Sequence, residues 1–241
     1  MKKKVFSFII LLISTNLFSQ SFQEFSGYNS TGFRVGFRLA PGISSSQIVG
    51  EGDYKGFRNN ADHIRLSLGP TLEYFLTSKI SLASGVYYTV KSVDYFLPND
   101  FKATKIPGLS AYQNKGASLY NLQYLQLPFT AKMYTGEIFN RSRFYLQFGG
   151  ILDFKIAENP LENEANPLEI YKLKQGENNV FGYADIAMLA GAGLEYEIGG
   201  SNALFFGFNY QRGLVGVNSS KTFSDLSTKN RIFALEIGIK F

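Results

Sequence analysis

The chain has 241 residues, of which 45% are hydrophobic and 18% charged, and it contains 23 Phe, 15 Tyr, no Trp and no Cys. That balance is too apolar for a disordered chain and too polar for a bundle of membrane-spanning helices, and a chain without Cys has no disulfide, thiolate metal ligand or cysteine nucleophile. The formal net charge is +5, but three basic residues are Lys2, Lys3 and Lys4, and the remaining 21 Lys and Arg against 19 Asp and Glu give +2. So small an excess excludes a nucleic-acid-binding surface.

The first twenty residues, Met1–Gln20, have the features of a secretory signal peptide: a basic start, the apolar run Val5–Ile13 and a short polar exit. The apolar run is too short for a transmembrane helix, which needs about 20 apolar residues. We therefore expect the segment to be cleaved and the protein to be exported, with any membrane embedding through strands. Residues 21–31 are predicted to form a periplasmic N-terminal lead, and residues 32–241 the folded domain.

Eight segments follow, each about ten residues long, in which apolar side chains alternate with small or polar ones. Period-two alternation over this length is typical of a tilted strand that crosses a bilayer. Long and short connections alternate between these segments. The same alternation occurs in outer-membrane barrels, whose tight turns are periplasmic. The sequence therefore predicts an all-β fold, an eight-stranded antiparallel transmembrane up-and-down β-barrel. The predicted strands are Gly32–Ala40, Ile64–Leu76, Lys79–Val90, Tyr124–Tyr134, Arg143–Lys155, Asp185–Ile198, Leu204–Arg212 and Asn230–Phe241.

The apolar face of these strands is predicted to point outward, toward lipid. Each strand carries four or five bulky apolar side chains, and the interior of an eight-stranded barrel has room only for a thin filling of side chains. The other face fits inside because seven of the eight strands place glycine on it, for example Gly36, Gly207 and Gly238. The last strand shows the pattern clearly, with Phe233 to Phe241 apolar at every second position, and pairing with the first strand would leave it no free edge.

Charged side chains on the inward face are predicted to form ion pairs that fill the lumen, because an unpaired charge there is costly and Arg binds carboxylates in a bidentate manner. The pair expected at the closing seam joins Glu236 to Arg34 or Arg38. A proton or ion path through these residues is the alternative. The structural lumen charges are Arg34, Arg38, Arg65, Glu73, Glu195 and Glu236, with Lys132, Arg143, Lys240, Asp153 and Glu197 on the same face.

His63, the only histidine, lies on the predicted loop side, just before Arg65 and Ser67. A neutral imidazole can take a proton from a hydroxyl nucleophile, which leaves a lipid hydrolase at this rim as one interpretation. On an extended strand, however, His63 and Ser67 are two pleats apart and beyond direct hydrogen-bond reach. We therefore favour a histidine that faces water, and we predict no catalytic residue, no cofactor and no metal site.

Two of the long connections carry clusters of one charge sign. The second long connection, about Lys91 to Leu119, is basic and aromatic. Its lysines either contact phosphates of surface glycolipid or are solvated. The third is acidic, and its carboxylates are either solvated or hold calcium or a basic partner. The basic cluster consists of Lys91, Tyr95, Phe96, Phe101, Lys102, Lys105, Tyr112 and Lys115. The acidic cluster consists of Glu158, Glu162, Glu164, Glu169 and Glu177.

Three stretches, Tyr124–Phe129, Leu189–Tyr196 and Asn230–Phe241, resemble the small outer-membrane β-barrel proteins of Bacteroidetes, often grouped as a porin or PorT-like family. The resemblance covers nearly the whole mature chain and implies location and fold. The last strand is also similar to the C-terminal signal that the barrel insertion machinery recognises, which implies that Phe241 is an insertion signal and interface anchor. Some members of the family serve a protein secretion apparatus, but no motif of this chain carries that role over.

The predicted function is that of a non-enzymatic outer-membrane β-barrel with a side-chain-filled lumen, acting as an envelope structural protein or binding a partner through its surface loops. Two alternatives stay open: an accessory subunit of a secretion or uptake complex, and an outer-membrane lipid hydrolase that uses the His63 rim. The expected partners are outer-membrane lipid, the insertion machinery during biogenesis and an envelope protein bound by the long loops. The expected location is the outer membrane of a Gram-negative bacterium.

Overall fold

The computed structural model describes residues 31–106, 117–139, 141–161, 166–199, 202–218 and 222–241, so the predicted signal peptide and nearly all of the lead lie outside the described residues. Its strands are β1 (Gly32–Gly50), β2 (Arg58–Asn59), β3 (His63–Phe75), β4 (Ile80–Gly85), β5 (Tyr87–Phe96), β6 (Ala117–Phe139), β7 (Ser142–Pro160), β8 (Ala184–Gly199), β9 (Asn202–Gly213) and β10 (Leu226–Lys240). Its helices are the 3-10 turn η3 (Gly52–Tyr54), α2 (Asn99–Lys105) and α3 (Pro167–Lys174). Within the described part of the chain, no helix is long and apolar enough to cross a membrane.

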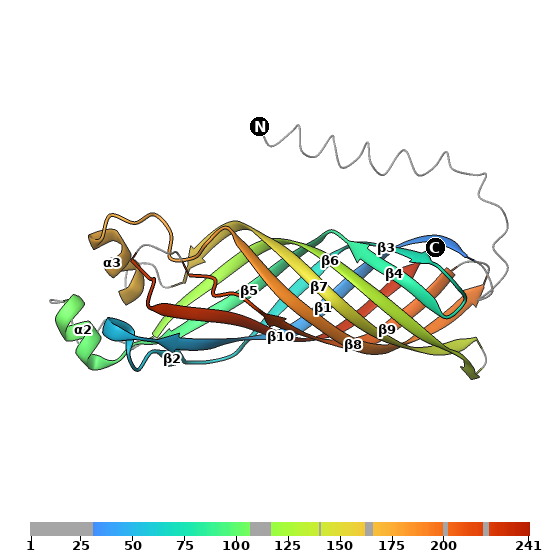
Figure 1. Ribbon diagram of the computed structural model, residues 1–241, viewed down its shortest axis with the longest axis horizontal. Coiled ribbons are helices and arrows are strands. Elements are labelled where there is room, and N and C mark those ends of the chain that lie inside the picture. The colour runs from blue at the N-terminus through green and yellow to red at the C-terminus, as the bar shows by residue number, and fades with distance from the viewer. Residues whose placement is uncertain (1–30, 107–116, 140, 162–165, 200–201, 219–221) are drawn as a thin grey trace, which may run out of the picture.

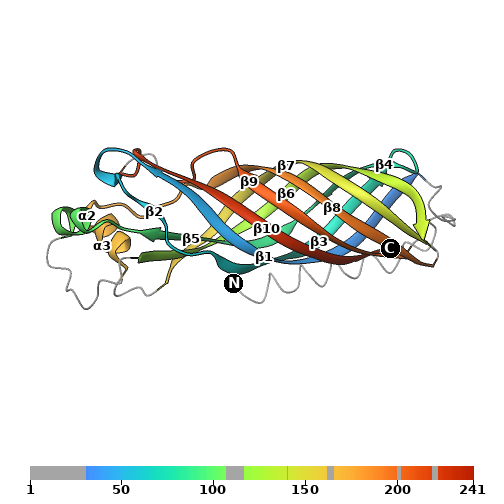
Figure 2. The same ribbon diagram turned by 90° about the horizontal axis from the view of Figure 1, so that it is seen from below.

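The strands form one antiparallel sheet whose pairings return to their starting point. β1 pairs with β10 on one side, from Gly36↔Lys240 to Gly50↔Leu226, and with β3 on the other. The remaining strands follow chain order, and the long cylinder in Figures 1 and 2 has α2 and α3 at one end and the C-terminus at the other. The predicted all-β, antiparallel up-and-down architecture is confirmed.

The described residues form ten strands where eight were predicted, and the difference has two local causes. β4 and β5 are two parts of one predicted strand, separated at Val86, and both pair with β3 and β6. Opposite this break Pro70 has no N–H to offer, and its carbonyl accepts a hydrogen bond from the Val86 N–H at 3.1 Å. β2 is a two-residue pairing with β5, outside the barrel wall.

Burial follows the predicted orientation of the two faces. In β1, Phe33 is 62% exposed and Phe37 46% exposed, whereas Arg34 and Arg38 between them are 7% and 4% exposed. The inward glycines are needed where strands approach one another closely: a Cβ at Gly238 would lie 2.3 Å from the Phe205 ring and from the Phe37 carbonyl oxygen. The apolar outer surface is therefore a belt around the barrel, with the polar residues inside.

The strands continue well beyond this belt at the end that carries the helices, which we call the loop end. β1 continues to Gly50, β6 begins at Ala117 and β7 ends at Pro160, inside stretches predicted to be loops. Here the pattern inverts, because Tyr120 and Leu122 of β6 point inward and are buried while Asn121 and Gln123 point outward. An apolar interior with a polar exterior is the arrangement of a domain surrounded by water. We call this extension the head.

Candidate functional site

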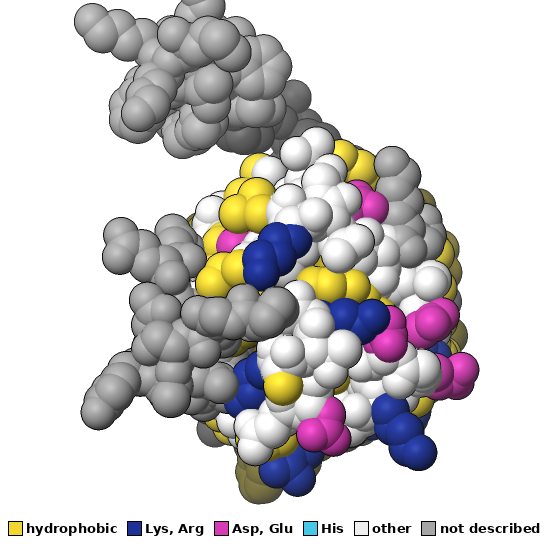
Figure 3. Space-filling model, turned by 90° about the vertical axis from the view of Figure 1, so that its left-hand side faces the viewer, with side chains coloured by type: hydrophobic (Ala, Val, Ile, Leu, Met, Phe, Trp, Pro, Cys, Tyr) yellow, Lys and Arg dark blue, Asp and Glu magenta, His cyan; other side chains and the backbone are white. Residues whose placement is uncertain are grey.

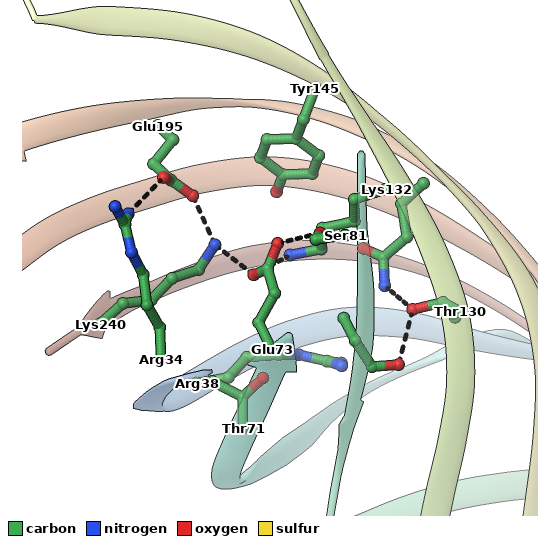
Figure 4. A network of polar contacts seen from close by, with 12 residues as sticks. Arg34, Arg38, Thr71, Glu73, Ser81, Thr130, Lys132, Tyr145, Glu195 and Lys240 are labelled. Carbon is green, nitrogen blue, oxygen red and sulfur yellow. Dashed lines mark hydrogen bonds and ion pairs between the residues drawn. The ribbon is translucent and has the colours of Figure 1, made fainter. Parts of the chain in front are cut away.

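Glu195 of β8 is the centre of an ion-pair network in the lumen (Figure 4). Its cross-strand partner Arg143 is the second residue of β7, which places the network at the turn end, opposite the head. Its carboxylate accepts from Arg143 Nη2 at 2.6 Å and from Arg34 Nη1 at 3.4 Å, and it pairs with Lys240 Nζ. The Tyr134 hydroxyl oxygen lies 3.2 Å from its second oxygen. All of these side chains are buried, so three cations are close to one carboxylate in a region that water does not solvate.

Glu73 of β3 is the second carboxylate of this network. Lys240 Nζ lies 2.5 Å from its Oε2 and Lys132 Nζ lies 3.5 Å away, while Ser81 and Tyr134 each donate a hydroxyl to Oε1 at 2.5 Å. Lys240 therefore bridges Glu73 and Glu195, two residues on strands that are far apart in the sheet. The network therefore joins two opposite walls of the barrel, β3 and β8, through Lys240 of the last strand.

Glu236 of β10 forms the ion pair that the sequence predicts at the closing seam. Its partner is Arg38, whose Nε lies 3.5 Å from Glu236 Oε2, whereas Arg34 pairs with Glu195 instead. The Tyr145 hydroxyl donates to Glu236 Oε1 at 2.8 Å, and Asn209 Nδ2 donates to Oε2 at 3.2 Å. The seam between β1 and β10 is thus fixed by backbone pairing on the wall and by this pair within the lumen.

A second network occupies the lumen nearer the head and is built on Lys91 of β5. Lys91 Nζ lies 2.6 Å from Asp153 and 3.1 Å from Asp185, and Asn230 Nδ2 donates to Asp185 at 2.9 Å. All four side chains are buried. The prediction that Lys91 belongs to a basic loop cluster is wrong, because β5 carries the residue into the barrel.

Side-chain amides connect the two networks. Gln126 Nε2 lies 2.9 Å from Asp153 and 3.2 Å from Gln211 Oε1, Gln211 Nε2 donates to Asn209 Oδ1 at 3.0 Å, and Asn209 reaches Glu236. The hydrogen-bonded chain therefore extends from Asp185 to Glu236 along the barrel axis. A neutral amide passes a proton along a hydrogen-bonded chain only if it changes its tautomer. The amide chain therefore favours a structural role for the lumen residues over a proton path.

Two cavities among these side chains are small. One cavity beside Arg38, Lys132 and Gln147, and another beside Arg65 and Gln211, are each about 10 Å³. A cavity of that size holds about one water molecule. Larger apolar grooves of about 630 and 410 Å³ lie on the lipid-facing side, lined by residues such as Val35, Leu72 and Phe129.

Arg65 lies apart from both networks. The structure leaves it half-exposed, with Nη2 donating to Asn121 Oδ1 at 2.6 Å and Nη1 donating to the Ile64 carbonyl at 2.8 Å. β3 pairs with β5 only at Ser67↔Thr89 and Leu68↔Tyr88, so its first residues leave the wall beside β5. Arg65 therefore joins neither ion-pair network, and its role as a lumen charge remains a prediction.

His63 does not meet Ser67. Its Nε2 lies 3.0 Å from Asp94 Oδ2, and Asn60 Nδ2 donates to the same oxygen at 3.0 Å. The buried Ser67 hydroxyl is instead 2.8 Å from Thr89 Oγ1. The arrangement brings a carboxylate to the histidine but no nucleophile, and it joins the displaced start of β3 to β5.

The head is packed around a core of aromatic and aliphatic side chains. The Phe181 ring is stacked on Tyr95 at 6.2 Å and meets the Tyr120 ring edge-on at 5.2 Å. Burial raises the pKa of the Tyr54 hydroxyl, which keeps its proton and donates to the Thr222 carbonyl at 2.6 Å. The core consists of Tyr54, Phe57, Val93, Tyr95, Leu97, Phe101, Ile106, Tyr120, Leu122, Tyr124, Leu168, Tyr171, Val180, Phe181, Val217, Phe223 and Leu226.

Both predicted loop clusters contribute to the head rather than forming free loops. From the basic cluster, Tyr95 and Phe101 enter the core and Lys105 pairs with Asp53 at 2.5 Å, which raises the pKa of Lys105. From the acidic cluster, Glu158 pairs with Lys155 at 2.6 Å. Tyr112, Lys115, Glu162 and Glu164 lie outside the described residues. No group of three acidic or histidine side chains suited to a metal ion occurs in the ranges that the structure describes.

A family model for the outer membrane protein beta-barrel domain matches residues 18–219 of the chain. The chain belongs to this family. No curated protein matches it. The outer membrane protein OprG of Pseudomonas aeruginosa has a similar structure, with a TM-score of 0.52 at 15% identity over 89% of this chain and 98% of OprG. Neisserial surface protein A gives a TM-score of 0.44 at 14% identity over 87% of this chain and 97% of that one.

Membership of this family points to the outer membrane of a Gram-negative bacterium as the location of the protein. The geometry adds three features that the sequence analysis missed: the head, the Lys91 network and the amide chain. Asn209 and Gln211 lie on the inward face of β9, so their alternation with Phe208 and Tyr210 carried a signal for the amide chain. The head gave no such signal, because its strands reverse the pattern used to find the others.

Proposed function

We propose that the protein is a non-conducting, non-enzymatic barrel that displays its packed head at the cell surface. The observation that supports this most strongly is the filling of the lumen by two ion-pair networks joined by amides, with cavities no larger than about 10 Å³ beside Arg38 and Arg65. The orientation follows from the tight turns at the opposite end, which are periplasmic in outer-membrane barrels. The head would then stand in the external medium.

Reconstituted protein is expected to give no stepwise conductance in planar bilayers and no swelling of liposomes in isotonic sugars. The physical reason is that permeation would require breaking several buried ion pairs at once. A porin reconstituted in parallel provides the positive control for both measurements. Size-dependent sugar uptake, or ohmic channel steps that scale with the amount of folded protein, would contradict the proposal.

A second candidate role, a subunit of a secretion or uptake complex, is favoured by the head itself. A chain whose only task was to stabilise the membrane has no need of a surface domain with its own aromatic core. The head surface carries Lys and Arg side chains dispersed among Asp and Glu (Figure 3). Photo-crosslinking from Leu173 of α3, which is 66% exposed, in intact cells is expected to give one discrete product for a complex subunit and none for a solitary barrel.

The resemblance to PorT-like proteins of Bacteroidetes supports the envelope role and suggests the source lineage. Phe241 is proposed to act as insertion signal and interface anchor. Its N–H donates to the Val35 carbonyl at 2.7 Å and its side chain is 53% exposed, at the turn end of the apolar belt. A terminal aromatic held in that position fits a periplasmic-interface anchor.

A further inference from the structure

Three basic residues lie together on the lipid-facing side of β9 and β10. Arg212 belongs to the outward row of β9 that also contains Phe208 and Tyr210, and Lys229 and Arg231 belong to the outward row of β10 that continues with Phe233. Arg212 is exposed, and the other two are half-exposed. We call Arg212, Lys229 and Arg231 the basic ridge.

The ridge sets two like charges directly opposite one another. Arg231 and Arg212 are cross-strand partners in the β9–β10 ladder. Side chains in that relation are about 5 Å apart at Cβ, and like charges there destabilise the pair. The flanking residues in the same row are Met188 of β8 and Ser45 of β1, neither of which can neutralise them.

No carboxylate compensates the ridge. In the described ranges of the chain, no ion pair includes Arg212, Lys229 or Arg231. Arg231 donates from Nη2 to Gln47 Oε1, but its Nε is buried without a hydrogen-bond partner. These cations contrast with those of the lumen, where Arg143 and Lys91 have carboxylates at 2.6 Å. The ridge therefore presents unsatisfied positive charge on the outer wall.

The position of the ridge indicates what neutralises it. The next outward residues toward the turn end are Tyr210 and Phe233, themselves cross-strand partners, and Phe233 lies 6.1 Å from the Phe208 ring. The ridge is thus at the loop-end edge of the apolar belt, where lipid headgroups meet acyl chains. Arginine pairs of this kind match the oxygens of a phosphate group.

We propose that the basic ridge binds the phosphate of an outer-leaflet glycolipid, with an acyl chain of that lipid lying against Tyr210, Phe233 and Phe208. The choice of leaflet rests on the orientation in the proposed function, with the head outside. Because the cations and the aromatic surface are contiguous, the ligand is a single molecule that carries both the phosphate and the acyl chains.

The test is native mass spectrometry of the folded protein in detergent, titrated with diphosphorylated lipid A and, in parallel, with phosphatidylcholine, whose phosphate is masked by choline. The double variant Arg212→Gln/Arg231→Gln is expected to bind lipid A at least tenfold more weakly than wild type, and raising the salt concentration should narrow the difference. Binding of phosphatidylcholine should be the same for both proteins. The charge-matched control, Lys55→Gln/Lys174→Gln, removes two exposed cations from the head and should bind lipid A like wild type.

Three outcomes would overturn the proposal: equal lipid A binding by wild type and the ridge variant, an equal loss in the control, or displacement of lipid A by millimolar inorganic phosphate. Folding is checked independently. Because the ridge variant loses a repulsive pair, it should resist urea in lipid-free detergent at least as well as wild type, while only wild type gains resistance when lipid A is added. If the variant were less stable without lipid, the repulsive pair inferred from the register would be wrong. The conductance measurement tests the filled lumen separately, since the ridge lies outside it.

Discussion

Replacing Glu195 by Gln is expected to lower the free energy of unfolding of the barrel by about 3–5 kcal/mol, because it removes one partner of a buried ionic network and leaves the others uncompensated. Arg34, Arg143 and Lys240 all pair with this carboxylate, and Lys240 also pairs with Glu73. Gln has nearly the shape of Glu, so packing is retained and the loss reports charge. A neutral residue at this position would remove one negative charge from a buried cluster that contains three cations.

The measurement is urea unfolding of the protein in lipid vesicles, followed by the mobility shift between folded and boiled protein on a denaturing gel. Glu51→Gln is the matched control, since Glu51 is exposed in the head and should change stability by no more than a few tenths of a kcal/mol. The double variant Glu195→Gln/Lys240→Met should lose less than the sum of the two single variants, because one uncompensated cation is removed with the carboxylate. Additive losses, or a Glu195→Gln protein as stable as wild type, would show that the network does not hold the barrel together.

The membrane-embedded part of the fold was predictable from sequence because its two environments differ at every second residue. Lipid requires the face of Phe33 and Phe37 to be apolar, and the crowded lumen requires Arg34, Gly36 and Arg38 to be polar or small. The same periodicity predicted that the last strand pairs with the first. It did not predict the break at Val86, which depends on how Pro70 meets its neighbour.

The head was not predictable in this way because water replaces lipid outside it. Along β6 the outward residues change from Leu125 and Leu127 to Gln123 and Asn121, while the inward residues change from Gln126 to Tyr124 and Leu122. The strand is continuous through this reversal, but the alternation that identifies a lipid-facing strand ends there. Polar residues outside a barrel strand therefore look like the beginning of a loop.

The choice of ionic partners was only partly accessible. A seam pair between neighbouring strands was predicted, and Glu236 with Arg38 fulfils it. Partners across the lumen, such as Lys91 with Asp185, depend on the barrel's tilt and stagger, which alternation alone does not determine. The same limitation applies to Arg65, whose hydrogen-bond partner Asn121 lies on β6 and not on a strand next to β3.

Replacing Phe181 by Ala is expected to open the head while leaving the barrel intact. Phe181 is 1% exposed and contacts both Tyr95 and Tyr120, so its removal should cost the head about 3–5 kcal/mol. The head core and the lumen are separated by the Lys91 network, and regions that share few apolar contacts open independently. The loss should therefore appear as local unfolding at the loop end and not as loss of the folded barrel.

Limited trypsin digestion of the folded protein measures this opening. Lys102 of α2 and Lys172 of α3 are buried in the closed head, so trypsin should cleave at these lysines quickly in Phe181→Ala and slowly in wild type. The folded barrel of the variant should still change its gel mobility when it is boiled. Tyr183→Ala is the matched control, an aromatic truncation two residues away at a side chain that is 74% exposed, and its digestion should follow wild type. If Phe181→Ala resisted trypsin like wild type, the head would not depend on this core. If it instead lost the folded barrel as well, head and barrel would form one cooperative unit, and the surface domain would be part of what holds the lumen closed.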